Sequence, residues 1–213
     1  MAKISLGILD GFIGKVGTVV GSFWKGKPVM RGYKRFVHNA KTSAQRAVRN
    51  RFATLVSLAS VFKEAIAIGF RREARSHVVT EGNVFVTNNW GSSQASAGGT
   101  VTVNYPQVVI ARGGLDSVTF GTPHFDNPFE VTVAFTPINE HANASDLVYL
   151  FLYSPDINQG LLSTPVQRSA GSISVTVPNN WNGLKVHVWG FTQGANDPTK
   201  VSNSSYVGSG NIA

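Results

Sequence analysis

The spacing of apolar residues divides the chain into three stretches with different periods. In residues 1–37, short apolar and β-branched pieces are interrupted by glycines, including Gly11, Gly14, Gly17 and Gly21. Because glycine at this density disfavours long helices, we predict short strands or extended segments joined by tight turns. Few of these side chains could form a core of their own. We therefore expect the stretch to pack on the following helix, on the rest of the chain or on another copy.

Residues 42–69 carry a helical pattern. Thr42 and Gln45 fit a capping box, and Gly69 is a stop signal. Apolar residues recur every three or four positions and so form one helical stripe: Val48, Phe52, Leu55, Ala59, Phe62 and Ile66. This pattern predicts one helix of about 27 residues, which is about 40 Å long. Such a helix is buried along its own domain or packs between subunits.

From residue 101 onward the apolar period changes to two. Residues 129–135 alternate apolar and polar side chains, which is typical of a strand with one buried face. Residues 147–153 are apolar at every position, which indicates a central strand. About seven short strands separated by Pro and Asn clusters favour an antiparallel sandwich resembling immunoglobulin or fibronectin type III domains.

The predicted fold class is therefore α+β and mainly β. It comprises a glycine-rich β or extended N-terminal segment, one long α-helix and an antiparallel immunoglobulin- or fibronectin-like β-sandwich. Residues 82–105 are rich in Ser, Thr, Asn and Gly and read as a connection. We place the domain boundary near 100, which gives a basic N-terminal region at 1–100 and a β-sandwich domain at 101–213.

The net charge of +8 is unevenly distributed. Residues 1–80 hold 15 Lys and Arg against three acids, giving +12, and residues 81–213 hold four against eight, giving −4. A basic region attracts nucleic acid, anionic lipid or an acidic protein face, and basic residues can also simply solubilise a helix.

Candidate chemistry is sparse. The chain has no cysteine, so thiolate metal sites and a cysteine nucleophile are excluded. Gly21, Gly26 and Lys27 fit the first positions of a phosphate-binding loop, but Pro28 stands where Ser or Thr should hold magnesium. The five histidines are scattered without metal-ligand spacing. We expect no enzyme activity, no cofactor and no metal, and the absence of an apolar run of about 18 residues argues against a membrane partner.

Aromatic and cationic residues are interleaved before the helix and form the best candidate contact surface. We predict an interface made of these residues and of the first turns of the helix: Phe23, Trp24, Lys25, Arg31, Tyr33, Arg46, Val48, Arg49, Phe52 and Leu55. Trp, Tyr and Arg are favoured at subunit interfaces. The aromatic rings and cations before the helix also suit internal packing, or nucleic acid, where rings stack on bases and cations meet phosphates.

Several longer motifs resemble an uncharacterised family from Bacteroidota and their crAss-like and related bacteriophages. The motifs are GFIGKVGTVVGSFWKG at 11–26, TSAQRAVR at 42–49, KVHVWGF at 185–191 and VSNSSYVG at 201–208. The family has no assigned activity. The resemblance implies a phage or prophage setting, so no catalytic residue can be transferred.

The expected function is that of a non-enzymatic structural protein of a phage particle, made in the bacterial cytoplasm and located in the virion. It would be a tail, collar or head-to-tail connector ring component that assembles with itself and other virion proteins through its N-terminal region. Two alternatives stay open. One is a basic nucleic-acid-binding protein, and the other is a host-surface adhesin or decoration protein that binds through loops 137–146 and 192–200.

Overall fold

The structure is a computed structural model that describes residues 3–4, 12–24, 26–37, 39, 41–96, 99–125, 128–136 and 143–213. The chain divides into two compact units, Met1–Lys41 and Thr42–Ala213. The division falls at residue 41 rather than near the predicted boundary at 100, because the helices after residue 42 share a core with the strands after residue 101.

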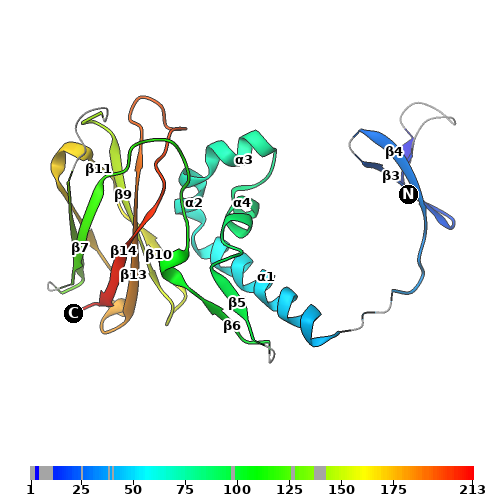
Figure 1. Ribbon diagram of the computed structural model, residues 1–213, viewed down its shortest axis with the longest axis horizontal. Coiled ribbons are helices and arrows are strands. Elements are labelled where there is room, and N and C mark those ends of the chain that lie inside the picture. Colours follow the sequence, from blue (N-terminus) through cyan, green and yellow to red (C-terminus); the bar gives the residue numbers. More distant parts are fainter. Residues whose placement is uncertain are drawn as a thin grey trace. The chain divides into compact units, whose positions relative to one another are not determined.

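The N-terminal unit is an antiparallel sheet in the order β1-β2-β3-β4, so the prediction of short strands joined by tight turns is confirmed (Figure 1). The strands are β1 (Lys3–Ile4), β2 (Phe12–Val16), β3 (Val19–Trp24) and β4 (Lys27–Gly32). Gly17, with φ of +59°, and Gly26, with φ of +78°, lie in the turns that follow β2 and β3. These left-handed conformations favour glycine because it has no Cβ.

The second unit begins with helices α1 (Ser43–Val61), α2 (Lys63–Gly69), α3 (Arg71–His77) and α4 (Glu81–Asn88). Thr42 caps α1 as predicted, since its hydroxyl accepts the Gln45 N–H at 3.2 Å. The predicted single helix over 42–69 is wrong, because the chain bends by 85° between α1 and α2. α1 packs on α4 and on the hairpin of Ser93–Ala95 and Val101–Val103, whereas α2 turns its Ala65 and Ile66 into the core that also holds Phe151 and Trp189. The bend at Phe62 keeps the apolar side chains of α2 in the core that α1 reaches.

Two larger antiparallel sheets follow. One has the order β10-β9-β13-β14 with β11 also paired to β9, and the other has the order β12-β8-β7. Their strands are β7 (Thr119–His124), β8 (Glu130–Thr136), β9 (Leu147–Ser154), β10 (Gln159–Leu162), β11 (Val166–Gln167), β12 (Ser172–Thr176), β13 (Lys185–Gln193) and β14 (Ser205–Asn211). A separate hairpin pairs β5 (Ser93–Ala95) with β6 (Val101–Val103). Short 3₁₀ turns lie at Tyr105–Gln107, Arg168–Ala170 and Asn179–Trp181.

The five-stranded sheet is buried on both faces, because β9 and β13 carry apolar side chains at nearly every position. Leu150 and Leu152 face a core shared with β8 and β12. Phe151, Trp189 and Phe191 face a second core, shared with the helices. Figure 1 shows the helices on the side of this sheet that lies away from β7. The reading of residues 147–153 as a central strand is therefore confirmed.

This arrangement corrects the predicted fold. The unit is mixed α and β, mainly β, with antiparallel sheets, but it has several short helices in place of one long one and no clear sandwich. Helices cover the face of the large sheet that a simple sandwich would leave to solvent. One further prediction is wrong, since residues 82–88 lie in α4 rather than in a connection. The segment 108–111 is held in place by Asn89. Its side-chain amide accepts the Val109 N–H at 2.7 Å and donates to the Val109 carbonyl at 2.8 Å.

Candidate assembly surfaces

The N-terminal sheet has one apolar face. Strand register places Val16 opposite Val19, Gly14 opposite Gly21, and Gly21 opposite Met30. Because side chains alternate along a strand, the following residues share this face, which we call the apolar face: Phe12, Gly14, Val16, Val19, Gly21, Phe23, Pro28, Met30 and Gly32. A Cβ at Gly21 would lie 2.7 Å from the Phe12 ring, so the ring rests on the glycine. Met30 is nevertheless 71% exposed, and within the described residues of the unit nothing buries this face.

The opposite face carries cations and aromatic rings together with two exposed apolar side chains, Ile13 at 58% and Val29 at 40%. The register places Lys15 opposite Val20, Val20 opposite Arg31, and Trp24 opposite Lys27. The Tyr33 N–H donates to the Thr18 carbonyl at 2.7 Å and so extends the pairing of β4 by one step. The Lys15 Nζ lies 3.6 Å from the centre of the Tyr33 ring. We call Lys15, Lys27, Arg31, Trp24 and Tyr33 the cationic face.

Nearly all of the protein's net charge belongs to the N-terminal unit. Residues 1–41 hold eight Lys and Arg against one acid, giving +7, and residues 42–213 hold 11 against 10, giving +1. Residues 42–80 add seven Lys and Arg against two acids, which is +5 of the +12 counted over residues 1–80. The arginines and lysine of the helices are balanced by acids elsewhere in their own unit.

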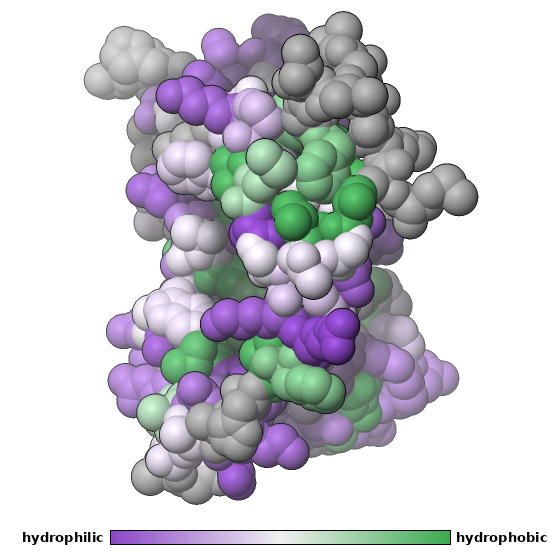
Figure 2. Space-filling view, turned by 90° about the vertical axis from the view of Figure 1, so that its right-hand side faces the viewer, coloured by the Kyte–Doolittle hydropathy of each residue, from purple (hydrophilic) through white to green (hydrophobic). Residues whose placement is uncertain are grey.

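A second apolar surface begins on α1. Val48 is 56% exposed and Phe52 is 52% exposed, and the partly exposed Val56 continues the line at four-residue spacing. We call Val48, Phe52 and Val56 the helix stripe. Hydrophobic side chains reach the surface in patches bordered by hydrophilic ones (Figure 2). Apolar side chains at this spacing form a continuous ridge on which a partner can pack.

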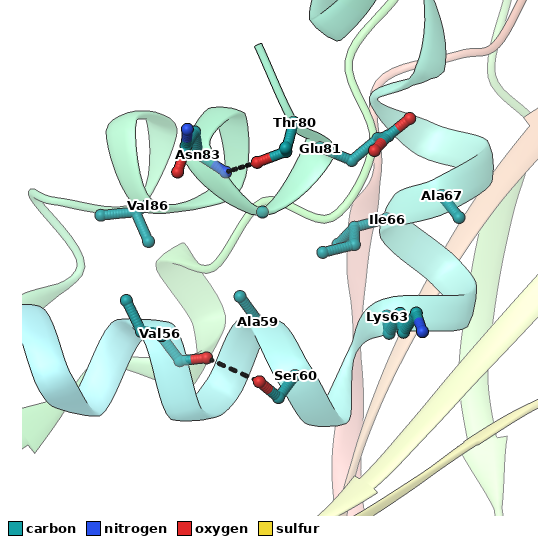
Figure 3. Close-up of a pocket in the computed structure, with 11 residues that line it drawn as sticks. Val56, Ala59, Ser60, Lys63, Ile66, Ala67, Thr80, Glu81, Asn83 and Val86 are labelled. Atoms are coloured by element: carbon teal, nitrogen blue, oxygen red, sulfur yellow. Dashed lines mark hydrogen bonds between the residues drawn. The ribbon is translucent and has the colours of Figure 1, made fainter. Parts of the chain in front are cut away.

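The helix stripe leads into a groove between α1, α2 and α4, with a volume of about 400 Å³. Figure 3 shows Val56 and Ala59 of α1 directed toward α4, and Ile66 of α2 on the same side. Val86 of α4 also lines the groove, and Glu81 is among its few charged residues. Ser60, Lys63 and Thr80 also line it, and its apolar side chains suit contact with an apolar partner.

The structure separates the predicted interface residues. Phe23 lies on the apolar face, whereas Trp24, Arg31 and Tyr33 lie on the cationic face. Lys25 lies outside the described residues. Arg46, Val48, Arg49 and Phe52 are exposed on α1. Leu55 is the one clear correction, because it is fully buried in the chain's own interior and cannot contact another subunit.

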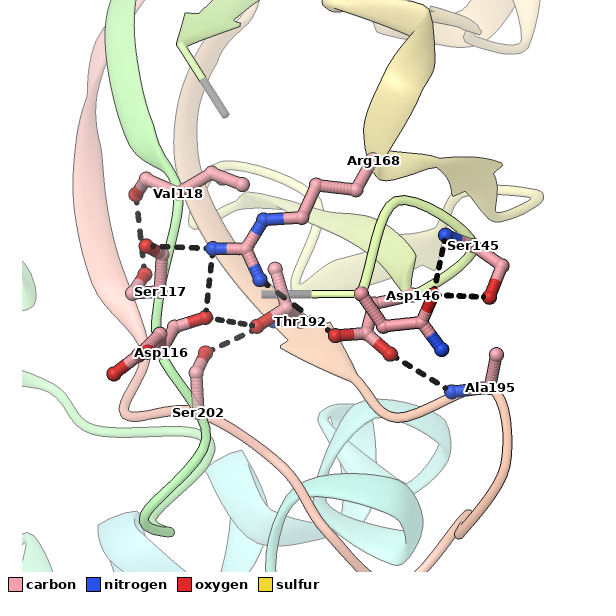
Figure 4. Close-up of polar contacts among 10 residues, drawn as sticks. Asp116, Ser117, Val118, Ser145, Asp146, Arg168, Thr192, Ala195 and Ser202 are labelled. Carbon is pink, nitrogen blue, oxygen red and sulfur yellow. Dashed lines mark hydrogen bonds and ion pairs between the residues drawn. The ribbon is translucent and has the colours of Figure 1, made fainter. Parts of the chain in front are cut away.

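Sequence reasoning missed a buried polar cluster, which is centred on Arg168 (Figure 4). The Arg168 Nη2 donates to the carbonyls of Asp116 and Ser117 at 2.9 and 3.0 Å, and Nη1 lies 3.7 Å from the Asp146 carboxylate. That carboxylate also accepts the Ala195 N–H at 3.1 Å. The cluster joins four segments outside the strands: those before β7, before β9, between β11 and β12, and after β13. Since its partners are mostly backbone groups, we assign it a structural role, and no sequence pattern around Arg168 marks it as buried.

His187 is a second buried polar residue, on β13. Its Nδ1 lies 2.8 Å from the Tyr206 hydroxyl, and its ring centre lies 4.4 Å from that of Tyr105. Burial, and next the nearby Lys185, lowers the pKa of His187 from 6.5 to about 4. The imidazole is therefore neutral near pH 7 and packs as part of an aromatic cluster.

Metal ions and membranes are two further kinds of partner to consider for the described residues. No group of three metal-ligating side chains occurs within them. In the same part of the chain no single helix combines the length and apolarity needed to cross a membrane, and only α1 and α2 taken together across their bend do so.

Comparison with known proteins places the chain in a family. A model for a family of unknown function (DUF6266) matches residues 11–208, so the chain belongs to that family. No curated protein matches the chain. Among solved structures, the chain is similar to the fibronectin type III domain of human collagen alpha-1(XX) chain, with 12% identity and a TM-score of 0.34. That similarity covers 47% of this chain and 87% of the collagen domain.

Proposed function

We propose that the protein is a non-enzymatic structural component of a phage particle that assembles with copies of itself through its N-terminal unit and helix stripe. The observation that carries the proposal is the apolar face of the N-terminal sheet. Val16, Phe23 and Met30 are exposed there although the sheet has a regular register. Two-sided exposure of a small sheet is unfavourable in water, so a partner surface is needed to bury it.

A second copy of the same sheet fits this face. Gly14 and Gly32 add no side chain to it, the Phe12 ring covers Gly21, and two sheets pack face to face at about 10 Å. The face presents no charged side chain among the described residues. The cations Lys15, Lys27 and Arg31 point the opposite way, so two copies can meet without opposing their charges. An isologous pairing of this kind gives a dimer.

The helix stripe and its groove supply a second contact. A dimer interface alone closes after two copies, whereas a ring or a longer assembly requires a further, different interface. Phe52 and Val56 form an exposed ridge beside a groove lined by Ile66 and Val86, and a ridge and a groove are complementary shapes. The motifs that resemble phage and prophage proteins supply the particle setting of the proposal, and the second unit would act as a rigid body carried by these contacts.

The proposal is tested by the mass of the full chain in solution. We expect an oligomer, and we expect Val16→Asp with Met30→Asp, or Phe52→Asp alone, to lower its mass. Ser57→Asp is the matched control, since it adds the same charge to an exposed position of α1 outside the helix stripe. If deletion of residues 1–41 leaves the number of copies in the oligomer unchanged, the proposal is contradicted. Mass spectrometry of purified particles tests the phage setting separately, because the protein must be present in them.

A further inference from the structure

We propose that the cationic face of the N-terminal sheet binds the phosphate backbone of nucleic acid. The proposal goes beyond self-assembly and uses the side of the sheet that assembly leaves open. Lys15, Lys27 and Arg31 are exposed there, and Trp24 is 66% exposed. Among the described residues of the unit no acidic side chain lies near them, and Asp10 is the one acid in residues 1–41 of the sequence.

The register sets the spacing of the cations. Lys15 and Arg31 lie two strands apart across Val20, which is about 10 Å, and Lys27 and Arg31 lie four residues apart on β4, which is about 13 Å. Each strand of a duplex presents one phosphate per about 3.4 Å of helix axis, and an unstacked single strand spaces its phosphates more widely, so these distances span at most about three to four phosphates. Three cations can therefore meet a single backbone segment at once.

Aromatic rings stand at both ends of this row. Trp24 is paired with Lys27 at one end, and Tyr33 lies against Lys15 at the other. Exposed rings beside cations allow unpaired bases to stack while the phosphates meet the charges. The cation–π contact also holds Lys15 and Tyr33 in place before a ligand arrives, which lowers the ordering cost of binding. This combination favours a single strand over a duplex.

Two other anionic partners fit less well. A membrane surface is engaged by a continuous apolar face with cations at its border, whereas beside these cations only Ile13 and Val29 are aliphatic and strongly exposed among the described residues. An acidic face on a second copy fits poorly as the partner, because residues 42–213 have a net charge of +1 rather than a negative one. A regular polyanion matches a face that carries a single sign of charge.

The test is a fluorescence anisotropy titration of the full chain with a labelled 20-nucleotide single-stranded DNA and with the corresponding duplex. Three phosphate contacts predict that affinity for the single strand falls about 20-fold between 50 and 200 mM salt, and about 40-fold for the duplex. The Lys27→Glu/Arg31→Glu variant should reduce the salt effect on single-strand binding to about threefold. Trp24→Ala should weaken single-strand binding about tenfold with the salt effect unchanged.

Arg72→Glu with Arg75→Glu is the matched control, since it changes the net charge equally on exposed positions of α3. It should bind DNA almost as the unchanged chain does. Equal losses in both double variants would overturn the proposal, as would the absence of binding to either DNA at 50 mM salt. Binding to phosphatidylserine vesicles that is as salt-sensitive as DNA binding would also overturn it. The mass of the oligomer should be the same in the Lys27→Glu/Arg31→Glu variant, which separates this proposal from that of assembly.

Discussion

Two phenylalanines of the same helical pattern, Phe52 and Phe62, lie about three turns apart and should have opposite roles. Phe62 is 0% exposed, and its ring centre lies 4.6 Å from that of Phe151, 5.1 Å from Tyr153 and 5.5 Å from Trp189. Removing a buried phenylalanine side chain costs about 3–5 kcal/mol, and loss of these aromatic pairs places Phe62→Ala toward the upper end. Phe52→Ala removes a half-exposed side chain and should change the free energy of unfolding by about 0.5 kcal/mol or less.

Urea unfolding of the full chain, followed by tryptophan fluorescence, measures both values under conditions of low protein concentration. The oligomer mass should respond in the reverse order, since Phe52→Ala removes a proposed contact whereas Phe62→Ala leaves the helix stripe in place. The reasoning is refuted if the two variants have free energies of unfolding within about 1 kcal/mol of each other. That result would mean that the bend at Phe62 does not anchor the helices to the sheet.

Three further predictions concern the second unit. Arg168→Met leaves the Asp146 carboxylate buried without its cation and should destabilise the fold by about 3–5 kcal/mol in chemical denaturation, whereas Arg112→Met, at the surface, should change it little. Since the folded pKa of His187 is about 4 and the unfolded value is 6.5, the unfolded chain binds a proton first as pH falls. Stability should therefore be complete above pH 6.5 and fall by about 2–3 kcal/mol by pH 4.5, and His187→Gln should remove most of this dependence. Gly69→Ala should prevent normal folding, as judged by circular dichroism and thermal melting, because the added Cβ would lie 2.2 Å from the Ile110 carbonyl oxygen, while Gly91→Ala, in open space, should be tolerated.

Local features of the fold could be read from the sequence because they depend on neighbouring residues. Thr42 caps its helix because its hydroxyl reaches an N–H three residues away. Glycine density indicated the short strands of the N-terminal unit. The period of two located β8, and the fully apolar run at 147–153 located the central strand β9. Each of these signals acts within one element, so no knowledge of distant contacts was needed.

The tertiary structure decided what lies beyond each element. The sequence determined that Val48, Phe52, Leu55 and Phe62 form one helical stripe. Only packing decided that the first two face outward and the last two face inward, because Leu55 and Phe62 reach the interior of the second unit whereas Val48 and Phe52 do not. Likewise the aromatic and cationic residues of 23–33 form a single cluster in the sequence. Strand pairing places Phe23 on the apolar face and Arg31 on the cationic face. Burial of Arg168 depends on carbonyls more than 50 residues away, and no local pattern records a contact of that kind.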